Sequence, residues 1–377
     1  MSDLVVARED DFDFRSAEYA ALYQRSDATL FQHPTWLDLV YRHRVPATGS
    51  ARVVVTVREQ AGGRLLLLLP LVRRRWRGIR LVEFADLGVC DYAAPVVDRD
   101  AAVRVLADPD VPRRVRAILG RFDLLHLQKL KGSPEPTVRL VGAREGRRLP
   151  YETHPIALPP ATEEWREKLL DPSFVRHLAR KRKRLRPKGE YAVVEVTDPD
   201  EVDAVLDRIR GFRASRFADR RAVDLMQDPD CFAFYSAVAR QSTVDGGPAT
   251  LSVVTVAGEP VAASLDLADE EEHLFLIVGY DFAKLRNYSL GLLIVDDLMD
   301  RAVASGLHTF DLTVGDEGYK SDFGATPVPM YAVRLPGTLR GRLAGWSMDR
   351  EASARRTLKR ARATRNAARE RRAHTQN

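Results

Sequence analysis

Short apolar runs recur along residues 4–335, and stretches with helical spacing lie between them. The apolar runs at 51–59 and 64–72 flank a Gly-Gly pair, a pattern that predicts a β-hairpin. A second hairpin is predicted at 250–268, around a Gly-Glu turn. The other predicted strands cover 4–7, 80–85, 122–130, 191–197, 273–281 and 308–315, and the predicted helices cover 17–25, 34–43, 111–119, 199–217, 230–241 and 290–305, with a further helix from about 162.

Both halves of the chain repeat one order of elements: two helices, a hairpin, a strand, a helix and a strand. This order predicts an internal duplication, and two unrelated α/β domains are the alternative. Between 131 and 160 the pattern degrades into Gly, Pro and charge, which predicts the crossing between two domains. We therefore predict an α/β fold with one domain at 1–155, a second at 156–335 and a tail at 336–377.

Composition narrows the class of protein. The chain has 377 residues, of which 45% are apolar and 30% charged, as in ordinary globular proteins of two or three domains. Two cysteines cannot form a disulfide framework, which favours a reducing compartment. The longest apolar run, 65–72, is too short for a membrane span, and the acidic start lacks a signal-peptide pattern, so we expect a cytoplasmic protein. Histidines and cysteines show no metal-ligand spacing, and we predict no metal.

The net charge of +6 is unevenly distributed. Residues 336–377 hold 12 Arg or Lys and 3 Asp or Glu, so the rest of the chain is slightly acidic. The tail is rich in Ala and Arg with scattered apolar residues, which predicts a solvated helix or a disordered arm. Contact of this arm with an anionic membrane surface or with nucleic acid is the alternative. We expect no stable nucleic-acid complex of the chain.

One strand–loop–helix–strand unit carries the strongest candidate chemistry. The strand ending at Asp281 leads through a loop to a helix from about Leu290, and the strand 308–315 follows, as in a βαβ crossover. A helix start suits a pyrophosphate, because it presents free N–H groups and the positive end of the helix dipole. The candidate anion-binding residues of this loop are Arg286, Asn287, Ser289 as N-cap, Leu290 and Gly291. An ordinary capped helix with a preceding Arg is the alternative.

The motif Arg-x-x-Ser-x-Gly at 286–291 resembles the pyrophosphate loop of GNAT acyltransferases, which reads Arg or Gln, two residues, Gly, one residue, then Gly or Ala. Ser289 replaces the first Gly of that pattern. The stretch 279–324 resembles the CelD-like acetyltransferases associated with bacterial polysaccharide biosynthesis, and the likeness covers most of 4–335. These proteins are similar to Fem-type aminoacyltransferases, which are built from two tandem GNAT-like domains. The resemblance implies mixed sheets flanked by helices, and acetyl-CoA or another acyl-CoA as co-substrate.

The same resemblance assigns catalytic roles. It implies that a backbone N–H near Val278 or Gly279 stabilises the oxyanion, although Gly279 also suits a bulge. The element from Tyr319 to Gly324 resembles the Lys-x-x-Phe-Gly of Fem proteins, so Lys320 would stabilise a phosphate or the developing anion, and Tyr319 would protonate the thiolate. A surface turn with a solvated Lys and a packed Tyr is the alternative. From the residues alone, Asp311 is a carboxylate in an apolar strand that either accepts the amine proton or holds the backbone.

A basic segment at 174–188 holds 8 Arg or Lys in 15 residues. Arg180 and Arg184 are predicted to bind a phosphate-bearing acceptor such as a nucleotide-linked or lipid-linked sugar, and a solvated helix face is the alternative. Tyr280 and Asp281, at the end of their strand, are further candidates for substrate binding.

These observations predict an acyl-CoA-dependent N-acyltransferase that acts on an amino group of a sugar or cell-envelope precursor. The first domain has no phosphate loop, so we expect a degenerate partner that shapes the acceptor cleft. Its Trp36, Asp91 and Tyr92 are predicted core and interdomain residues, and a catalytic role for them is the alternative. One alternative is a Fem-type enzyme whose donor is aminoacyl-tRNA. Another is a non-catalytic protein that uses the scaffold and the basic tail for binding.

Overall fold

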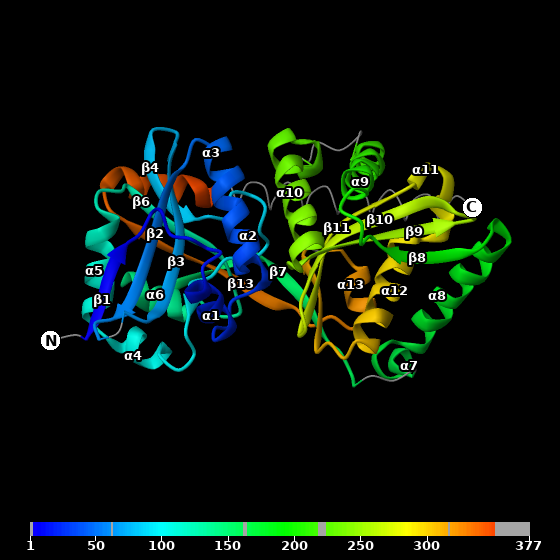
Figure 1. Cartoon of the computed structure of the whole chain (residues 1–377), viewed down its shortest axis with the longest axis horizontal. Coiled ribbons are helices and arrows are strands. Elements are labelled where there is room, and N and C mark those ends of the chain that lie inside the picture. Colours follow the sequence, from blue (N-terminus) through cyan, green and yellow to red (C-terminus); the bar gives the residue numbers. More distant parts are fainter. Residues whose placement is uncertain (1–2, 62, 161–163, 218–223, 316, 351–377) are drawn as a thin grey trace.

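The computed structural model describes residues 3–350 except 62, 161–163, 218–223 and 316. Within this part of the chain, 13 strands form one mixed sheet in the order β1-β2-β3-β4-β6-β13-β7-β12-β11-β10-β9-β8, with β5 paired to β3. Two lobes lie side by side along this sheet (Figure 1). None of the helices in the described ranges has the length and apolar character needed to cross a membrane.

The first lobe contains both predicted elements and elements that the pattern did not indicate. Its strands are β1 (Leu4–Arg8), β2 (Ala51–Glu59), β3 (Leu65–Trp76), β4 (Ile79–Phe84), β5 (Val96–Val97) and β6 (Leu124–Lys131). Its helices are α1 (Ala17–Gln24), α2 (Pro34–Leu39), α3 (Val45–Ala47), α4 (Ala102–Ala107), α5 (Asp110–Leu119) and α6 (Glu135–Val141), with a 3-10 turn at Leu30–Gln32 and a π-helical turn at Val40–Arg44. The hairpin β2–β3 pairs antiparallel, as its two apolar runs predicted.

The second lobe follows the predicted order closely. Its strands are β8 (Tyr191–Glu195), β9 (Ala249–Val256), β10 (Glu259–Ala268), β11 (Glu272–Tyr280) and β12 (Thr309–Val314). Its helices are α7 (Trp165–Leu169), α8 (Pro172–Leu185), α9 (Val202–Phe217), α10 (Pro229–Asp245), α11 (Phe282–Leu285), α12 (Leu290–Ala304) and α13 (Tyr319–Asp322), with 3-10 turns at Arg186–Lys188, Leu225–Gln227 and Arg286–Tyr288. Side-chain caps explain where two long helices begin: Asp171 accepts from the Ser173 N–H and Asp228 from the Cys231 N–H.

The segment 131–160 is not the irregular crossing that its composition predicted. It forms α6 and the long strand β7 (Gly146–Ala157), and the predicted boundary at 155 falls inside this strand. β7 pairs with β12 of the second lobe through its last residues. The division into the two predicted domains stays a prediction, since one strand serves both lobes.

The last strand, β13 (Val328–Pro336), returns to the first lobe. It pairs antiparallel with β6 on one side and with β7 on the other, and Figure 1 shows it in orange between the lobes. The lobes also share a hydrophobic core, in which Trp36 of α2 packs edge to face on Phe234 of α10 at 5.0 Å between ring centroids. This shared packing positions residues of the first lobe beside β12.

Candidate active site

The parallel strands β11 and β12 separate partway along their length. They pair only at three positions, from Glu272 with Thr309 to Leu274 with Asp311. At the same level β11 carries an extra residue opposite β10, between Leu274 and Ile277. β12 is distorted too, because Thr313 has a φ of +56° and its pairing with β7 shifts register. The distortions end the ladder between the two strands, as expected of bulges.

A cavity of about 620 Å³ occupies the gap between these strands. Its walls come from the second halves of β11 and β12, from the start of α12 and from the loop that leads into α13. Of the predicted site residues, the structure brings seven to this cavity: Val278, Tyr280, Ser289, Leu290, Gly291, Tyr319 and Lys320. The cavity therefore joins the predicted anion-binding loop to the predicted catalytic loop.

Ser289 begins α12 through its backbone. Its φ of +58° and ψ of 44° are left-handed, and its carbonyl accepts from the N–H groups of Leu292 and Leu293. Ser289 is the N-cap residue of α12, as predicted, but its side chain makes no capping hydrogen bond. A left-handed residue at this position explains why the resembling loops carry glycine there, since glycine adopts that conformation without steric cost.

Two other loop residues have defined surroundings. A Cβ atom on Gly291 would lie 3.2 Å from Cε1 of Tyr280, so the glycine makes room for this ring at the helix start. Asn287 is exposed, and its carbonyl accepts from Nζ of Lys181 on α8 at 3.0 Å. The side chain of Arg286 lies outside the described residues.

Gly279 does not line the cavity. A Cβ atom there would lie 2.8 Å from the carbonyl oxygen of Ile209, so the glycine lets α9 approach β11. Val278 does line it, and its carbonyl accepts from Nη1 of Arg213 on α9 at 3.0 Å. Asp281 is half-buried beyond the cavity wall, where its N–H donates to the carbonyl of Val261 at 2.8 Å.

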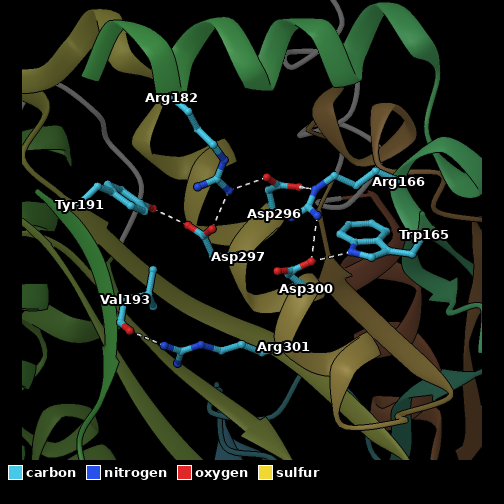
Figure 2. Close-up of polar contacts among 9 residues, drawn as sticks. All are labelled: Trp165, Arg166, Arg182, Tyr191, Val193, Asp296, Asp297, Asp300 and Arg301. Atoms are coloured by element: carbon cyan, nitrogen blue, oxygen red, sulfur yellow. Dashed lines mark hydrogen bonds and ion pairs between the residues drawn. The ribbon is translucent and has the colours of Figure 1, made fainter. Parts of the chain in front are cut away.

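The basic side chains on the two sides of helix α8 have different surroundings. On its inner side, Arg182 binds Asp296 and Asp297 of α12 at 2.5 Å each, and Arg166 adds a 2.8 Å contact to Asp296 (Figure 2). The Asp296 side chain is buried, so this paired charge fixes α12 against α8. The exposed cations of α8 are Arg176, Arg180, Lys183 and Arg184.

Arg184 lies near the candidate loop, and Arg180 faces a separate hollow. The Arg184 guanidinium lies 5.8 Å from the ring centroid of Tyr288, within the loop before α12. Arg180 lines a hollow of about 510 Å³ together with Phe174 and His177, between α8 and α13. The two arginines are therefore on the outer side of the candidate site rather than in the cavity between the strands.

Asp311 is fully buried and does not line the cavity. Its Oδ2 accepts from the Tyr92 hydroxyl and from Nζ of Lys131, both at 2.8 Å. Its Oδ1 accepts from the Thr153 hydroxyl at 3.0 Å and from the Thr313 N–H at 2.8 Å. Lys131 lies on β6, Thr153 on β7 and Tyr92 in the first lobe, whereas Thr313 belongs to β12 itself. The carboxylate therefore ties the lobes together at the distorted end of β12.

Lys320 is buried, and its Nζ donates to the carbonyls of Leu312 at 2.8 Å and Thr313 at 3.1 Å. Oε2 of Glu317 lies 3.4 Å from the same nitrogen. Burial lowers the pKa of Lys320, and Glu317 opposes this effect. Lys320 therefore fixes the end of β12 at the cavity wall. Tyr319 packs its ring edge to face on Phe323 at 6.3 Å, also at the cavity.

Glu317 was not among the predicted catalytic residues, and Asp91 was predicted mainly as a core or interdomain residue. Glu317 lines this cavity and a neighbouring one of about 520 Å³, which Lys320 also lines. Asp91 reaches the end of β12 from the first lobe; burial raises its pKa, and Lys129 and the Thr313 hydroxyl lower it. Glu317 had a local signal, its place in a Gly-rich loop after a strand, whereas the approach of Asp91 depends on tertiary packing that no local pattern shows.

The acetyltransferase (GNAT) domain model matches residues 172–321. No curated protein matches the chain. Among solved structures, FemX is similar with a TM-score of 0.57 and 10% identity, over 83% of this chain and 94% of its own. A conserved protein of unknown function from Bacteroides thetaiotaomicron is similar with a TM-score of 0.53 and 11% identity, over 88% of this chain and 100% of its own.

L-PGS from Bacillus licheniformis is similar with a TM-score of 0.50 and 11% identity, over 84% of this chain and 91% of its own. Such likenesses, at this low identity, concern the fold. Together with the domain match they confirm the predicted α/β fold with a mixed sheet flanked by helices and a GNAT unit in the second lobe. The prediction of an enzyme of the acyltransferase class is confirmed by the GNAT match.

Proposed function

We propose that this GNAT-type acyltransferase transfers an acyl group from acyl-CoA, with acetyl-CoA as the simplest donor, to an amino group of a sugar or cell-envelope precursor. One observation carries the proposal: β11 and β12 part at the point where the start of α12 opens onto the cavity between them. A thioester carbonyl in this gap would face both the loop at Glu317 and the helix start. The cytoplasmic location and the CelD-like role in polysaccharide synthesis are parts of the same proposal.

The donor side of the cavity suits a pyrophosphate. Helix starts favour anions, because their first N–H groups have no partner within the helix and the helix dipole is positive there. The left-handed Ser289 turns the chain into α12 at the cavity wall. Lys181 and Arg184 of α8 contact the preceding loop at Asn287 and Tyr288, which brings cations to the same end.

The chemistry requires one group that takes a proton and one that gives a proton. Glu317 accepts the proton of the attacking amine, whose nitrogen bonds to the carbonyl carbon as the carbon–sulfur bond breaks. Tyr319 gives its phenolic proton to the departing thiolate. Lys320 holds the end of β12, through Leu312 and Thr313, and so keeps both groups at the cavity.

The acceptor would enter through the neighbouring cavity of about 520 Å³. Glu317 and Lys320 line both cavities, so an amine in the second cavity can meet a thioester in the first. Arg148, Glu152 and His154 of β7 supply polar and charged groups there, as a sugar acceptor needs. Since β7 serves both lobes, this supports a first domain, 1–155, that shapes the acceptor cleft for a catalytic domain at 156–335.

One observation favours a second donor, aminoacyl-tRNA. Four cations, Arg176, Arg180, Lys183 and Arg184, are exposed on α8, and Arg184 lies near the candidate loop. A row of exposed cations binds a polyanion such as tRNA more strongly than it binds a single nucleotide. The two donors differ in size and charge, and a direct binding experiment separates them.

Thermal unfolding of the full chain would be measured with acetyl-CoA, with coenzyme A and with aminoacyl-tRNA. A specific ligand at about 100 times its Kd stabilises the folded state by about 2.7 kcal/mol, which raises the midpoint by several degrees. We expect this shift with acetyl-CoA, followed by release of free thiol when amino sugars are added. Protection by aminoacyl-tRNA alone would replace the proposed donor with the second one, and no shift with either would overturn the site.

A further inference from the structure

A helix at residues 339–350 follows β13 and exposes a row of large apolar side chains. Leu339 is 76% exposed, Leu343 66% and Trp346 57%. Their spacing of four and three residues puts all three on one side of a helix. The other large apolar side chains that are exposed in the described ranges come singly from separate elements, so this row is a distinct surface.

The opposite side of this helix is docked on the first lobe, where Figure 1 shows it in orange-red. Ala344 is buried and packs in a cluster with Leu81 of β4 and Leu124 of β6. A Cβ atom on Gly341 would overlap the backbone of Asp123, so only glycine allows this approach. The carbonyl of Gly345 accepts from Nη1 of Arg334 at 3.1 Å. The helix is thus fixed by its small residues, and its apolar row faces away from the protein.

Positive charge surrounds the apolar row. Arg340, Arg342 and Arg350 are exposed on the same helix, and the Arg350 guanidinium lies 4.6 Å from the ring centroid of Trp346. The one acidic residue of the helix sequence, Asp349, binds Nη1 of Arg334 at 2.6 Å and is also paired with Arg147. The charge that this face presents is therefore positive.

We propose that residues 339–350 dock on an anionic phospholipid surface. Leu339, Leu343 and Trp346 enter the boundary between headgroups and acyl chains, and the arginines contact lipid phosphates. An apolar row that includes a tryptophan and is bordered by arginines is the composition of an interfacial helix. The sequence that follows, 351–377, adds nine Arg or Lys against two Asp or Glu, which strengthens attraction to anionic lipid.

Other occupants of this face fit less well. The sequence 351–377 has one large apolar residue, Leu358, and offers little to cover three. A second copy related by two-fold symmetry would bring the arginines of the two helices together, and like charges repel. Nucleic acid would use the arginines and leave the apolar row in water. The lipid surface alone satisfies both the charge and the apolar row.

The test uses the full chain and sedimentation with vesicles. We expect co-sedimentation with vesicles that contain phosphatidylglycerol, weaker binding at high salt, and none with phosphatidylcholine alone. The double variant Leu339→Ser/Leu343→Ser should lower the binding constant by about ten-fold or more, since two apolar insertions are lost. Each of Arg340→Ser and Arg342→Ser should lower it by about five-fold.

A matched control and a spectroscopic readout make the test specific. Val103 of α4 is 82% exposed on another part of the first lobe, and Val103→Ser should leave vesicle binding unchanged. Trp36 and Trp165 are buried, and Trp76 is half-buried in the cluster beneath this helix. A blue shift of emission that vesicles cause in the wild type and not in Trp346→Phe therefore reports insertion of Trp346 and excludes a response of Trp76. All variants should keep the wild-type unfolding midpoint, because the substituted side chains point outward.

Several results would overturn the proposal. Failure of the wild type to sediment with anionic vesicles is the simplest. Equal binding by the Leu339→Ser/Leu343→Ser variant would mean that charge alone acts and the apolar row does not. A change of oligomeric state in that variant, seen by light scattering, would assign the row to a second copy, and stronger binding to RNA than to vesicles would assign it to nucleic acid. None of these results bears on acyl transfer.

Discussion

Replacement of Asp311 by asparagine separates the two roles that its sequence allowed. The carboxylate accepts hydrogen bonds from Tyr92 and Lys131 at one oxygen and from Thr153 and the Thr313 N–H at the other. The amide keeps the shape and one accepting oxygen. It places an NH₂ group against Lys131, so a buried ion pair between the lobes is lost.

The expected cost follows from these contacts. A hydrogen bond to a charged group is worth about 1.5–3 kcal/mol, and breaking a fully buried pair costs about 3–5 kcal/mol. The Lys131 side chain is 24% exposed and can reach water, which moves the loss toward the lower values. We expect Asp311→Asn to lower the free energy of unfolding by about 2–3 kcal/mol.

Urea unfolding and enzymatic turnover, measured on the same samples, distinguish a structural from a catalytic role of Asp311. Asp245→Asn is the matched control, because Asp245 also pairs across the lobes, with Arg15 at 3.0 Å, but at an exposed position. An exposed pair contributes about 0–1 kcal/mol, so this variant should unfold nearly as the wild type does. At urea concentrations well below its unfolding transition, the Asp311→Asn variant should retain turnover. A variant that folds with normal stability and loses turnover by about 100-fold or more would make Asp311 the general base and refute the structural role.

Three further predictions concern the same region. Ser289→Gly should raise the unfolding midpoint, because a left-handed non-glycine residue costs about 1–2 kcal/mol, whereas Ser305→Gly, at a φ of −80° at the other end of α12, should lower it. Gly279→Ala should lower the free energy of unfolding by about 1–3 kcal/mol in a urea titration, since its Cβ would meet the Ile209 carbonyl. Burial raises the pKa of the Glu272 carboxyl from 4.5 to about 7. The contribution of this group to the free energy of unfolding is therefore full below pH 4.5 and is lost as the pH rises through 7. Glu272→Gln should remove this part of the pH dependence, measured by urea unfolding across that range.

Periodicity predicted the strands with long apolar runs and missed β7, β13 and the two-residue β5. The strands β2, β3, β9, β10 and β11 have apolar runs because they cover a core. β7 has mostly half-buried or exposed side chains, two prolines and several charges, so its sequence resembles a linker. Its strand geometry comes from its neighbours β12 and β13, which no local pattern can show.

The candidate loop was predictable because its features are local: an apolar strand, a short loop and an apolar helix in sequence order. The partners of its residues were not. Asp311 lies 180 positions from Lys131 and 219 from Tyr92, and such pairs carry no sequence signal. Gly279 shows another limit of prediction from sequence. Glycine suits both a backbone oxyanion donor and the close packing of a helix, and only the position of Ile209 in the fold identifies the second role.

The path of the chain connects the candidate active site to the proposed lipid-binding face. After the loop at Glu317 and Lys320, β13 returns to the first lobe and pairs with β6 and β7. The helix at 339–350 then docks on that lobe rather than on the one that carries the cavity. Lipid contact at this helix would therefore hold the first lobe at the surface and leave β11 and β12 free to part around a donor. β7 lines the proposed acceptor cavity and pairs with β13, which leads to this helix. A lipid-anchored acceptor in the same membrane would therefore lie on the side of the first lobe, next to the acceptor cavity.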